Sequence, residues 1–294
     1  MPIDNFIVYV FIFIDNFLKN IGKIRKSGPD PELTDSEVIT IEIVGEFLGC
    51  GKGDKTIFDY FHQHWHSWFP KLNCRYTFAK QSANLWKIKE ALYREIIRIC
   101  LESSQSNIVI SDGLPLPTCH IKRVRKNNPL RLDGAFSYCA AKDQKYFGFK
   151  GHLLTNDDGL ILNFAIAPAN VDERDVLPEV VDGILASITN LVIADKGLIR
   201  PSLKEHLKKR GIDLQTPLRD NMKDKRPKWL MNWAMNVRRI IETTNSQLVG
   251  RFNIQAIRAK DLWHFASKVL RKILAHSFAF MIAGGLEFDG ILNG

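Results

Sequence analysis

The stretch YFGFKGHLLTNDDGLILNFAIA, residues 146–167, holds two apolar runs on either side of the turn sequence Asn156-Asp157-Asp158-Gly159. Asp-Gly between two apolar runs is a strong hairpin signal, because glycine readily takes the positive φ that tight hairpin turns need. The stretch therefore predicts two antiparallel strands, over Tyr146–Leu154 and Leu160–Ala167.

Short apolar strands and helices alternate around this hairpin. Ile108-Val109-Ile110 is a short apolar run that precedes it. The elements predicted after it are a helix over Glu173–Leu185, a strand over Leu191–Ala194, a helix over Pro201–Arg210, a strand over Ile212–Thr216 and a helix over Asn236–Val249. The order β-β-β-α-β-α-β-α is typical of an α/β fold with a mixed sheet, in which an antiparallel hairpin lies beside parallel strands and helices flank the sheet.

The segments outside this core are predicted to be helical. Thr34-Asp35-Ser36-Glu37 has the spacing of a capping box and opens an amphipathic run to Leu48. A glycine-rich turn and a second helix, over Thr56–Trp68, could complete a helix-turn-helix, although a plain helical packing domain explains the pattern equally well. Further helices are predicted over Ser82–Leu101 and Asp261–Ala283.

These patterns divide the chain into three parts. We expect a helical N-terminal region over residues 1–104 that is a candidate for DNA binding, an α/β domain over residues 105–253, and a helical C-terminal tail over residues 254–294.

The composition excludes several classes of protein. The chain has 294 residues, of which 45% are hydrophobic and 25% charged, the balance of a globular protein rather than a disordered or collagen-like one. The uncharged stretch Asn5–Ile14 is about half as long as a membrane span, and no basic segment precedes it, so neither a transmembrane helix nor a signal peptide is expected. The five cysteines are odd in number and scattered, which favours reduced thiols in a cytoplasmic protein.

The net charge of +9 lies entirely beyond residue 104, where 28 Lys and Arg stand against 19 Asp and Glu. Two clusters concentrate it: Lys122, Arg123, Arg125, Lys126 and Arg131, and Arg219, Lys223, Lys225, Arg226 and Lys228. Such clusters neutralise phosphates, so nucleic acid is the leading partner class, with a merely solvated basic surface as the alternative.

Two predicted strands run into an aspartate. Asp112 follows the run 108–110 after one serine, and Asp195 follows the strand Leu191–Ala194. Open α/β sheets bind ligands at the carboxyl ends of their strands, so adjacent parallel strands would point both acids into one crevice. Paired carboxylates form an oxygen-rich site that suits Mg²⁺ or Mn²⁺. The alternative is that each aspartate caps the turn or helix that follows.

A third candidate acid lies on the predicted helix over Asn236–Val249. Arg238, Glu242 and Asn245 recur at spacings of four and three, so they share one helical face. An arginine one turn before a glutamate favours the ionised carboxylate, as a metal ligand requires, but an ordinary surface salt bridge would look the same. Asp172 and Asp175 compete for the metal role, and their place at a helix start explains them without a metal.

Five segments in order resemble one family. SDGLPLP around Asp112, IADKG around Asp195 and RRIIETTNSQL around Glu242 resemble the DDE motifs of bacterial insertion-sequence transposases, in particular insertion-sequence family 982. YFGFKGHLL and APANVDERDV resemble the second-strand and third-strand segments of that family. The resemblance spans roughly residues 105–285. The five segments fall on the strands and helices that the sequence patterns predict, in the order expected for the family.

The resemblance implies an RNase H-like catalytic core in which Asp112, Asp195 and Glu242 are catalytic and hold two divalent ions, Mg²⁺ or Mn²⁺. The implied activity is transposition, a form of DNA recombination: metal-dependent cleavage at transposon ends, then strand transfer of the freed 3′-hydroxyl into target DNA. The same carboxylates would serve two alternatives, a nuclease of this fold without strand transfer and a catalytically silent DNA-binding descendant.

The implied partners are double-stranded DNA, both the terminal inverted repeats and the target, and further copies of the chain as a homodimer or larger synaptic complex. No membrane is involved, and the expected location is the bacterial cytoplasm, with action at the nucleoid. The residues expected to contact DNA are Lys122, Arg123, Arg125, Lys126, Lys223, Lys225, Arg226, Arg238 and Arg239. Arg239 and Arg251 are candidates for orienting the terminal phosphate.

The segment Pro217–Met235 precedes the Glu242 helix and changes character along its length. Its first half is basic and is expected to contact DNA. Trp229 and Trp233 are four residues apart and would share one face of a helix, so we expect both to pack the Glu242 helix onto the core.

Overall fold

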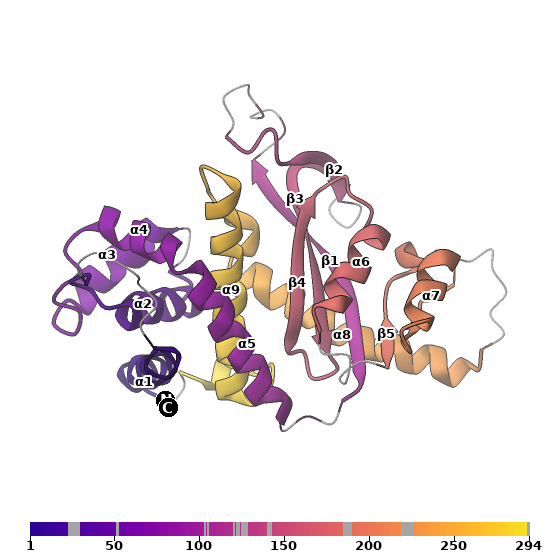
Figure 1. Cartoon of the computed structure of the whole chain (residues 1–294), viewed down its shortest axis with the longest axis horizontal. Helices are drawn as coiled ribbons and strands as arrows, with labels where there is room; N and C mark the ends of the chain where they lie inside the picture. Colours follow the sequence, from indigo (N-terminus) through magenta and orange to yellow (C-terminus); the bar gives the residue numbers. More distant parts are fainter. Residues whose placement is uncertain are drawn as a thin grey trace. The chain divides into compact units, whose positions relative to one another are not determined.

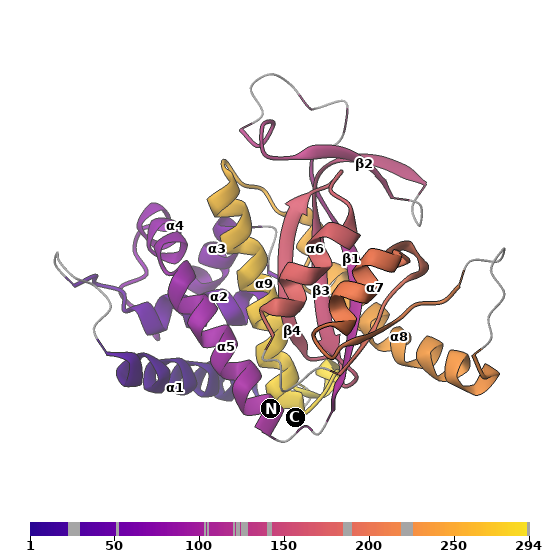
Figure 2. The ribbon, with the colours of Figure 1, turned by 45° about the vertical axis from the view of Figure 1, so that its right-hand side comes forward.

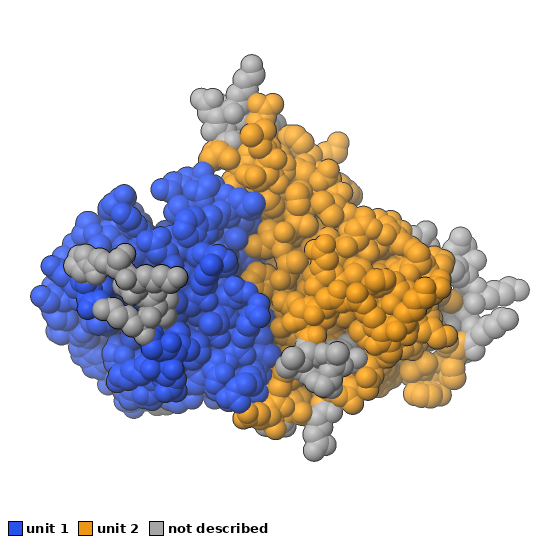
Figure 3. Space-filling model, viewed as in Figure 1, with its two compact units in different colours: residues 1–99, 248–294 blue, residues 100–247 orange. Residues whose placement is uncertain are grey.

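The computed structural model describes residues 1–22, 30–50, 53–102, 104, 106–119, 121, 124, 129–139, 143–184, 190–218 and 226–292. The chain divides into two compact units, each with its own core (Figure 3). The α/β unit comprises Cys100–Gln247, and the helical unit comprises Met1–Ile99 together with Leu248–Gly294.

A mixed sheet forms the centre of the α/β unit (Figure 1). Its strands are β1 (Ile108–Cys119), β2 (Ala135–Cys139), β3 (Gln144–Asn156), β4 (Ile161–Pro168), β5 (Leu191–Ile193) and β6 (Asp213–Gln215). The order is β2-β3-β1-β5-β6, and β4 also pairs with β3. Strand β3 is antiparallel to β1, β2 and β4, whereas β1, β5 and β6 are parallel.

The predicted hairpin is confirmed as β3 and β4. At its turn the backbone N–H of Asn156 donates to the carbonyl of Leu160 at 3.0 Å, and Gly159 has a φ of 93°. Residues with a side chain rarely adopt that φ, so the Asp-Gly sequence supplies what the turn needs.

Helices cover both faces of the sheet. Helix α6 (Glu173–Asp182) packs on β3 and β4, and α7 (Pro201–Lys208) packs on β6. Asp112 and Gly113 are neighbours on β1, so their side-chain positions lie on opposite faces. Asn245 of α8 (Lys228–Gly250) donates a hydrogen bond to Asp112 on one face, and Glu173 of α6 lies beside Gly113 on the other. The sheet therefore lies between α6 and α8 (Figure 2). This mixed sheet with flanking helices is the predicted RNase H-like arrangement.

Three elements of this unit differ from the prediction. Strand β1 was expected to span 108–110 but continues to Cys119, because beyond Ile110 it leaves β5 and stays paired with β3. Asp112 consequently lies inside a strand rather than at its end. Strand β2 was not predicted, although Phe136 and Tyr138 alternate with less exposed residues. Helix α8 begins about two turns earlier than expected, directly after Pro227, which is a favourable residue at a helix start.

The helical unit packs around α2 (Asp35–Phe47). The other helices are α1 (Ile3–Ile21), α3 (Asp54–His64), α4 (Arg75–Asn84), α5 (Trp86–Glu102, of which the last residues belong to the α/β unit) and α9 (Leu262–Ala283). The predicted capping box is confirmed: Thr34 accepts from the N–H of Glu37 at 3.2 Å, and Glu37 accepts from the N–H of Thr34 at 2.7 Å. A single helix over Ser82–Leu101 was wrong, because α4 ends at Asn84 and α5 begins at Trp86. No helix among the described residues is long and apolar enough to cross a membrane.

Helix α9 packs against α2, so the segment predicted as a separate tail shares a core with the N-terminal helices. Charge pairing explains why. Glu42 and Glu46 on α2 are 0% and 1% exposed, and α9 brings Arg271 and Lys272 to them. The guanidinium of Arg271 lies 2.7 Å from Glu46 and 3.0 Å from Glu42, and the ammonium of Lys272 lies 2.5 Å from Glu46.

Lys89 of α5 and Asp54 of α3 complete this buried network. Lys89 lies 3.1 Å from Glu42, and Asp54 lies 2.7 Å from Arg271. Burial alone would raise the pKa of Glu42, but the charges of Lys89 and Arg271 hold that pKa below its usual value. Each buried acid is therefore neutralised by a cation from another helix, which ties α2, α3, α5 and α9 together.

We predict that Arg271→Met destabilises the protein by about 3–5 kcal/mol, because it removes a buried guanidinium that pairs with Glu42, Glu46 and Asp54. Urea unfolding at neutral pH measures the loss. The control is Arg94→Met, which removes an ion pair whose arginine is 75% exposed and should change stability by less than about 1 kcal/mol. Equal, small losses in both variants would contradict the prediction.

Candidate active site

Asp112 and Asp195 lie at the same distance beyond the last residue pair of two adjacent parallel strands. Ile110 of β1 is paired with Ile193 of β5, and each aspartate follows two residues beyond this pair. The two strands are adjacent and parallel, which is the condition under which both acids were expected to point into one crevice. The negative charge of Asp195 contributes to raising the pKa of Asp112, so the two carboxyl groups interact.

The environment of Asp112 makes its charged form costly. Burial, with smaller contributions from the charges of Glu173 and Asp195, raises the pKa of this half-buried carboxyl to about 6. A hydrogen bond from the N–H of Gly113 and the charge of Arg238 act in the opposite direction. The side-chain amide of Asn245 donates to Oδ2 of Asp112 at 2.8 Å and fixes its orientation.

Asp195 is held differently. It precedes a short 3₁₀ turn (Lys196–Leu198), but its side chain makes no capping hydrogen bond there. Instead Oδ1 accepts a hydrogen bond from Nη1 of Arg238 at 3.2 Å. Since Asp112 lies inside a strand and Asp195 does not cap with its side chain, helix capping explains neither residue.

Helix α8 presents one face to both aspartates. Arg238 reaches Asp195 and Asn245 reaches Asp112, and Glu242 lies between them on the same helical face. Glu242 is exposed. The expectation that Arg238 pairs with Glu242 was wrong, because its guanidinium turns to Asp195. Within the described part of the chain, no three His, Cys, Asp or Glu side chains lie close enough together to hold a metal ion, so Asp112, Asp195 and Glu242 do not form a closed cluster in this structure.

Sequence patterns did not indicate the residues behind Asp112, on the α6 face. Nζ of Lys150 lies 2.9 Å from Oε1 of Glu173, and a Cβ at position 113 would meet that same oxygen at 2.7 Å. Glycine after Asp112 therefore lets Glu173 pack against the strand. His152 lies opposite Gly113, and burial lowers its pKa to about 4. The register of β1 against β3 brings these residues together, so no short motif could reveal them.

The competing acids Asp172 and Asp175 are explained by the start of α6, as expected. Asp172 accepts from the backbone N–H of Arg174 as the N-cap and also pairs with the side chains of Arg174 and Arg200. Asp175 pairs with Arg200. These cations hold the pKa of Asp172 at about 2.

The expected DNA contacts are only partly within the described residues. Lys122, Arg123, Arg125, Lys126, Lys223 and Lys225 lie outside them. Arg226 donates to the side chain of Gln215 and to the carbonyl of Thr216. Arg239 is exposed, and Arg251 pairs with Asp289.

The two tryptophans of α8 do not act alike. Trp233 is half-buried against the sheet, but Trp229 is 69% exposed. The expectation that both residues pack the helix onto the core was therefore wrong for Trp229. It lies on the first turn of the helix, close to where the described segment begins.

Fold and site together define an RNase H-like α/β unit with two interacting carboxylates at the meeting of its parallel strands. A family model described as a transposase DDE domain matches residues 102–262, more than half of the chain. The chain belongs to this family of DDE transposases. Among curated proteins, none matches the chain significantly.

One solved structure aligns with the chain, the crystal structure of the Mos1 mariner paired end complex with Mn. The two chains are 8% identical, and the alignment covers 83% of this chain and 70% of the other, with a TM-score of 0.24. A likeness of that quality carries no argument about this chain.

We predict that Asp112→Asn stabilises the metal-free protein above pH 6 by about 2–3 kcal/mol. The folded-state pKa of about 6 exceeds that of an unfolded aspartate, so ionising Asp112 favours unfolding as the pH rises between these two values. Below about pH 4 both states are protonated and the gain disappears. Urea unfolding with chelator at pH 7.5 and at pH 4 measures it, and an equal difference at both pH values would contradict the assignment.

Proposed function

We propose that this chain is the transposase of a bacterial insertion sequence related to insertion-sequence family 982. In this proposal Asp112, Asp195 and Glu242 cleave DNA at the ends of the element and then join the freed 3′-hydroxyl to target DNA. The observation that carries the proposal is the place of Asp112 and Asp195, each two residues beyond the last residue pair of the parallel strands β1 and β5, where Asn245 and Arg238 of the helix that bears Glu242 contact them.

The donor groups fit a hard divalent cation. All three are carboxylates, the ligands that Mg²⁺ and Mn²⁺ prefer. The pKa of about 6 at Asp112 supports this fit, because burial and, to a smaller extent, the charges of Glu173 and Asp195 make its ionised form costly, and a bound cation would relieve that cost. Two ions held by Asp112, Asp195 and Glu242 would supply activation of the nucleophile and stabilisation of the leaving oxygen.

The neighbouring residues would prepare this donor set. Asn245 orients Asp112 through its amide, and Arg238 holds the side chain of Asp195 in place. Glu242, one turn beyond Arg238 and exposed, is free to complete the set from the same helical face. Glu173 and Lys150 pack behind Gly113 and support the strand that carries Asp112.

The two proposed reactions differ only in their nucleophile. Water attacks the phosphodiester at the transposon end and leaves a 3′-hydroxyl, and that hydroxyl then attacks a phosphodiester of the target. One carboxylate site can serve both steps, since each displaces an oxygen from phosphorus. The substrate is double-stranded DNA with terminal inverted repeats, and joining two ends requires at least a homodimer in the synaptic complex.

We predict that Asp112→Ala, Asp195→Ala and Glu242→Ala each lower strand cleavage by at least about a hundredfold and leave DNA affinity nearly unchanged, because binding rests on phosphate contacts elsewhere. Single-turnover assays with Mg²⁺ on DNA containing the element's ends measure cleavage and joining. Asp175→Ala is the matched control, since its partner is Arg200. Cleavage that survives in Glu242→Ala would remove Glu242 from the site.

The same assays separate the alternatives. Cleaved ends without joined products would indicate a nuclease of this fold, and DNA binding without cleavage in the wild type would indicate a catalytically silent descendant.

We also predict that the basic cluster Lys122, Arg123, Arg125 and Lys126 contacts the DNA backbone. Replacing one of these residues with alanine should weaken binding to any sequence and reduce the slope of log affinity against log salt by about one. Fluorescence anisotropy over a range of salt concentrations measures the slope. An unchanged slope after removal of all four would assign the cluster to solvated surface.

A further inference from the structure

Strand β1 has an open edge beside the candidate active site. It pairs with β5 over Ile108–Ile110 and then continues along β3. At Asp112 and Gly113 no strand among the described residues pairs with β1 on the β5 side. A ligand bound at this edge can therefore be reached by side chains from both faces of the sheet.

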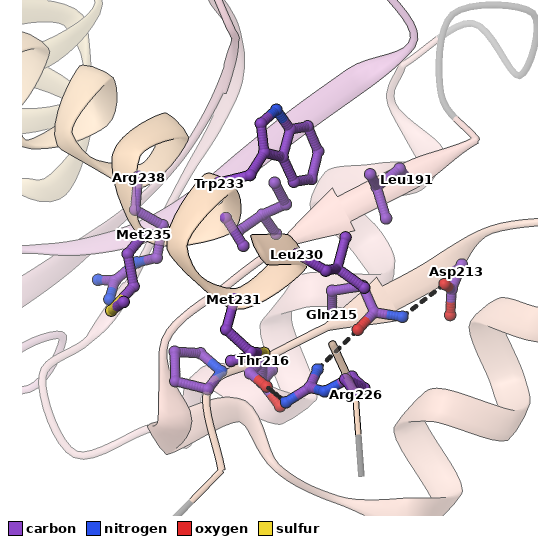
Figure 4. Close-up of a pocket in the computed structure, with 13 residues that line it drawn as sticks. Leu191, Asp213, Gln215, Thr216, Arg226, Leu230, Met231, Trp233, Met235 and Arg238 are labelled. Atoms are coloured by element: carbon purple, nitrogen blue, oxygen red, sulfur yellow. Dashed lines mark hydrogen bonds between the residues drawn. The ribbon is translucent and has the colours of Figure 1, made fainter. Parts of the chain in front are cut away.

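The α8 side of this edge is occupied by a cation and apolar side chains. Arg238, which bonds Asp195, also lines a cavity of about 150 Å³ between α8 and the edge of β5 and β6 (Figure 4). The walls of the cavity are mainly apolar. Its carboxylate, Asp213, accepts a hydrogen bond from Gln215 at 2.6 Å, and Figure 4 shows it on the far side of the cavity from Arg238. A further carboxylate can therefore come from the α6 face.

Glu173 is the acid that α6 brings to the open edge of β1. Its Oε1 would lie 2.7 Å from a Cβ at position 113, so the carboxylate packs directly against the backbone next to Asp112. The negative charge of Glu173 raises the pKa of Asp112 more than the charge of Asp195 does. Glu173 therefore interacts with Asp112 at least as strongly as the proposed metal ligand Asp195.

Lys150 binds the carboxylate of Glu173 in this structure. Its Nζ lies 2.9 Å from Oε1, and the two side chains are 21% and 30% exposed. This ion pair holds Glu173 toward β3, which gives a physical reason why the acids around Asp112 do not form a closed cluster among the described residues. Partly exposed ion pairs contribute little to stability, so a divalent cation can displace the lysine.

Two buried polar atoms near Asp112 have no hydrogen-bond partner among the described residues. One is Oδ1 of Asn245 on the α8 face, and the other is Nε2 of His152, which lies opposite Gly113 on the face of Glu173. His152 is only 5% exposed, and the charge of Glu173 acts on its pKa. Buried polar atoms in proteins are nearly always bonded, so each of the two has a bonding position left for a ligand or its water molecules.

We propose that Glu173 is a fourth carboxylate of the metal site, which Lys150 restrains until an ion binds. The inference rests on the proposed function, since it takes the site of Asp112 and Asp195 to bind divalent ions. On metal binding, Glu173 exchanges the ammonium of Lys150 for the ion across the open edge of β1. A carboxylate oxygen is the ligand that a hard divalent cation prefers.

Two substitutions that break the same ion pair test the proposal. Binding of Mn²⁺ to the full-length protein without DNA is measured at neutral pH from the electron paramagnetic resonance signal of the free ion. Glu173→Gln should weaken binding about ten- to a hundredfold, the usual loss when a supporting group of a metal site is removed. Lys150→Met should strengthen binding several-fold, because it frees Glu173. An ion pair with a structural role alone would shift both variants in the same direction.

Three further variants separate the effects of charge, reach and folding. Glu173→Asp keeps the charge but shortens the side chain, so it should weaken Mn²⁺ binding nearly as much as Glu173→Gln. Lys150→Met should no longer strengthen binding when it is combined with Glu173→Gln. Asp175→Asn is the matched control, because Asp175 lies on the same first turn of α6 and pairs with Arg200. It should bind Mn²⁺ as the wild type does.

Wild-type affinity in Glu173→Gln or Glu173→Asp would overturn the proposal, as would parallel changes in Glu173→Gln and Lys150→Met. Strengthening by Lys150→Met that persists without Glu173 would overturn the restraint, since the lysine would then act by its charge alone.

The proposed function fails separately. Mn²⁺ binding that requires Asp112 and Asp195 but not Glu173 would overturn the fourth carboxylate alone. Binding that requires all three residues, without cleavage of DNA, would support the fourth carboxylate and overturn the catalytic proposal. Absence of Mn²⁺ binding by the wild type would overturn both.

Discussion

The parallel pairing of β1 with β5 is the constraint on which the α/β unit depends. It places Asp112 and Asp195 at matching positions, where burial and mutual repulsion raise the pKa of Asp112 to about 6. The helices on the two faces of the sheet contact the residues around these two carboxylates. Helix α8 approaches from one face with an amide for Asp112 and a guanidinium for Asp195, and Glu173 of α6 packs against Gly113 from the other.

In the helical unit, by contrast, the buried acids are paired with cations. Glu42 and Glu46 each contact cations from other helices, and these contacts hold the packing of α2 against α9. Asp112, by contrast, receives a neutral amide from Asn245, and the guanidinium of Arg238 is bonded to Asp195. The helical unit thus neutralises its buried acids with cations, whereas the half-buried Asp112 receives a hydrogen bond only from neutral groups among the described residues. This contrast supports a functional role for Asp112, since carboxylates with perturbed pKa values concentrate at functional sites.

Sequence patterns predicted those parts of the fold that depend on interactions between residues close together in the sequence. The Asp-Gly turn, the capping box at Thr34 and the place of Asp195 just after a short apolar strand all follow from short stretches. The length of β1 could not be predicted, because its second half is stabilised by β3 and not by its own sequence. Contacts between residues far apart in the sequence were also unpredictable. Arg238 pairs with the distant Asp195, and α9 packs with α2 through Glu42 and Glu46, which by residue type would be expected on the surface.

The central claim is that Asp112, Asp195 and Glu242 share divalent metal ions. Crystals soaked in Mn²⁺ test it most directly, because anomalous scattering locates the ion without reference to activity. The account predicts anomalous peaks within bonding distance of carboxylate oxygens from all three residues, with the Glu242 side chain turned toward the aspartates. Peaks that contact neither aspartate, or that leave Glu242 uncoordinated, would contradict it.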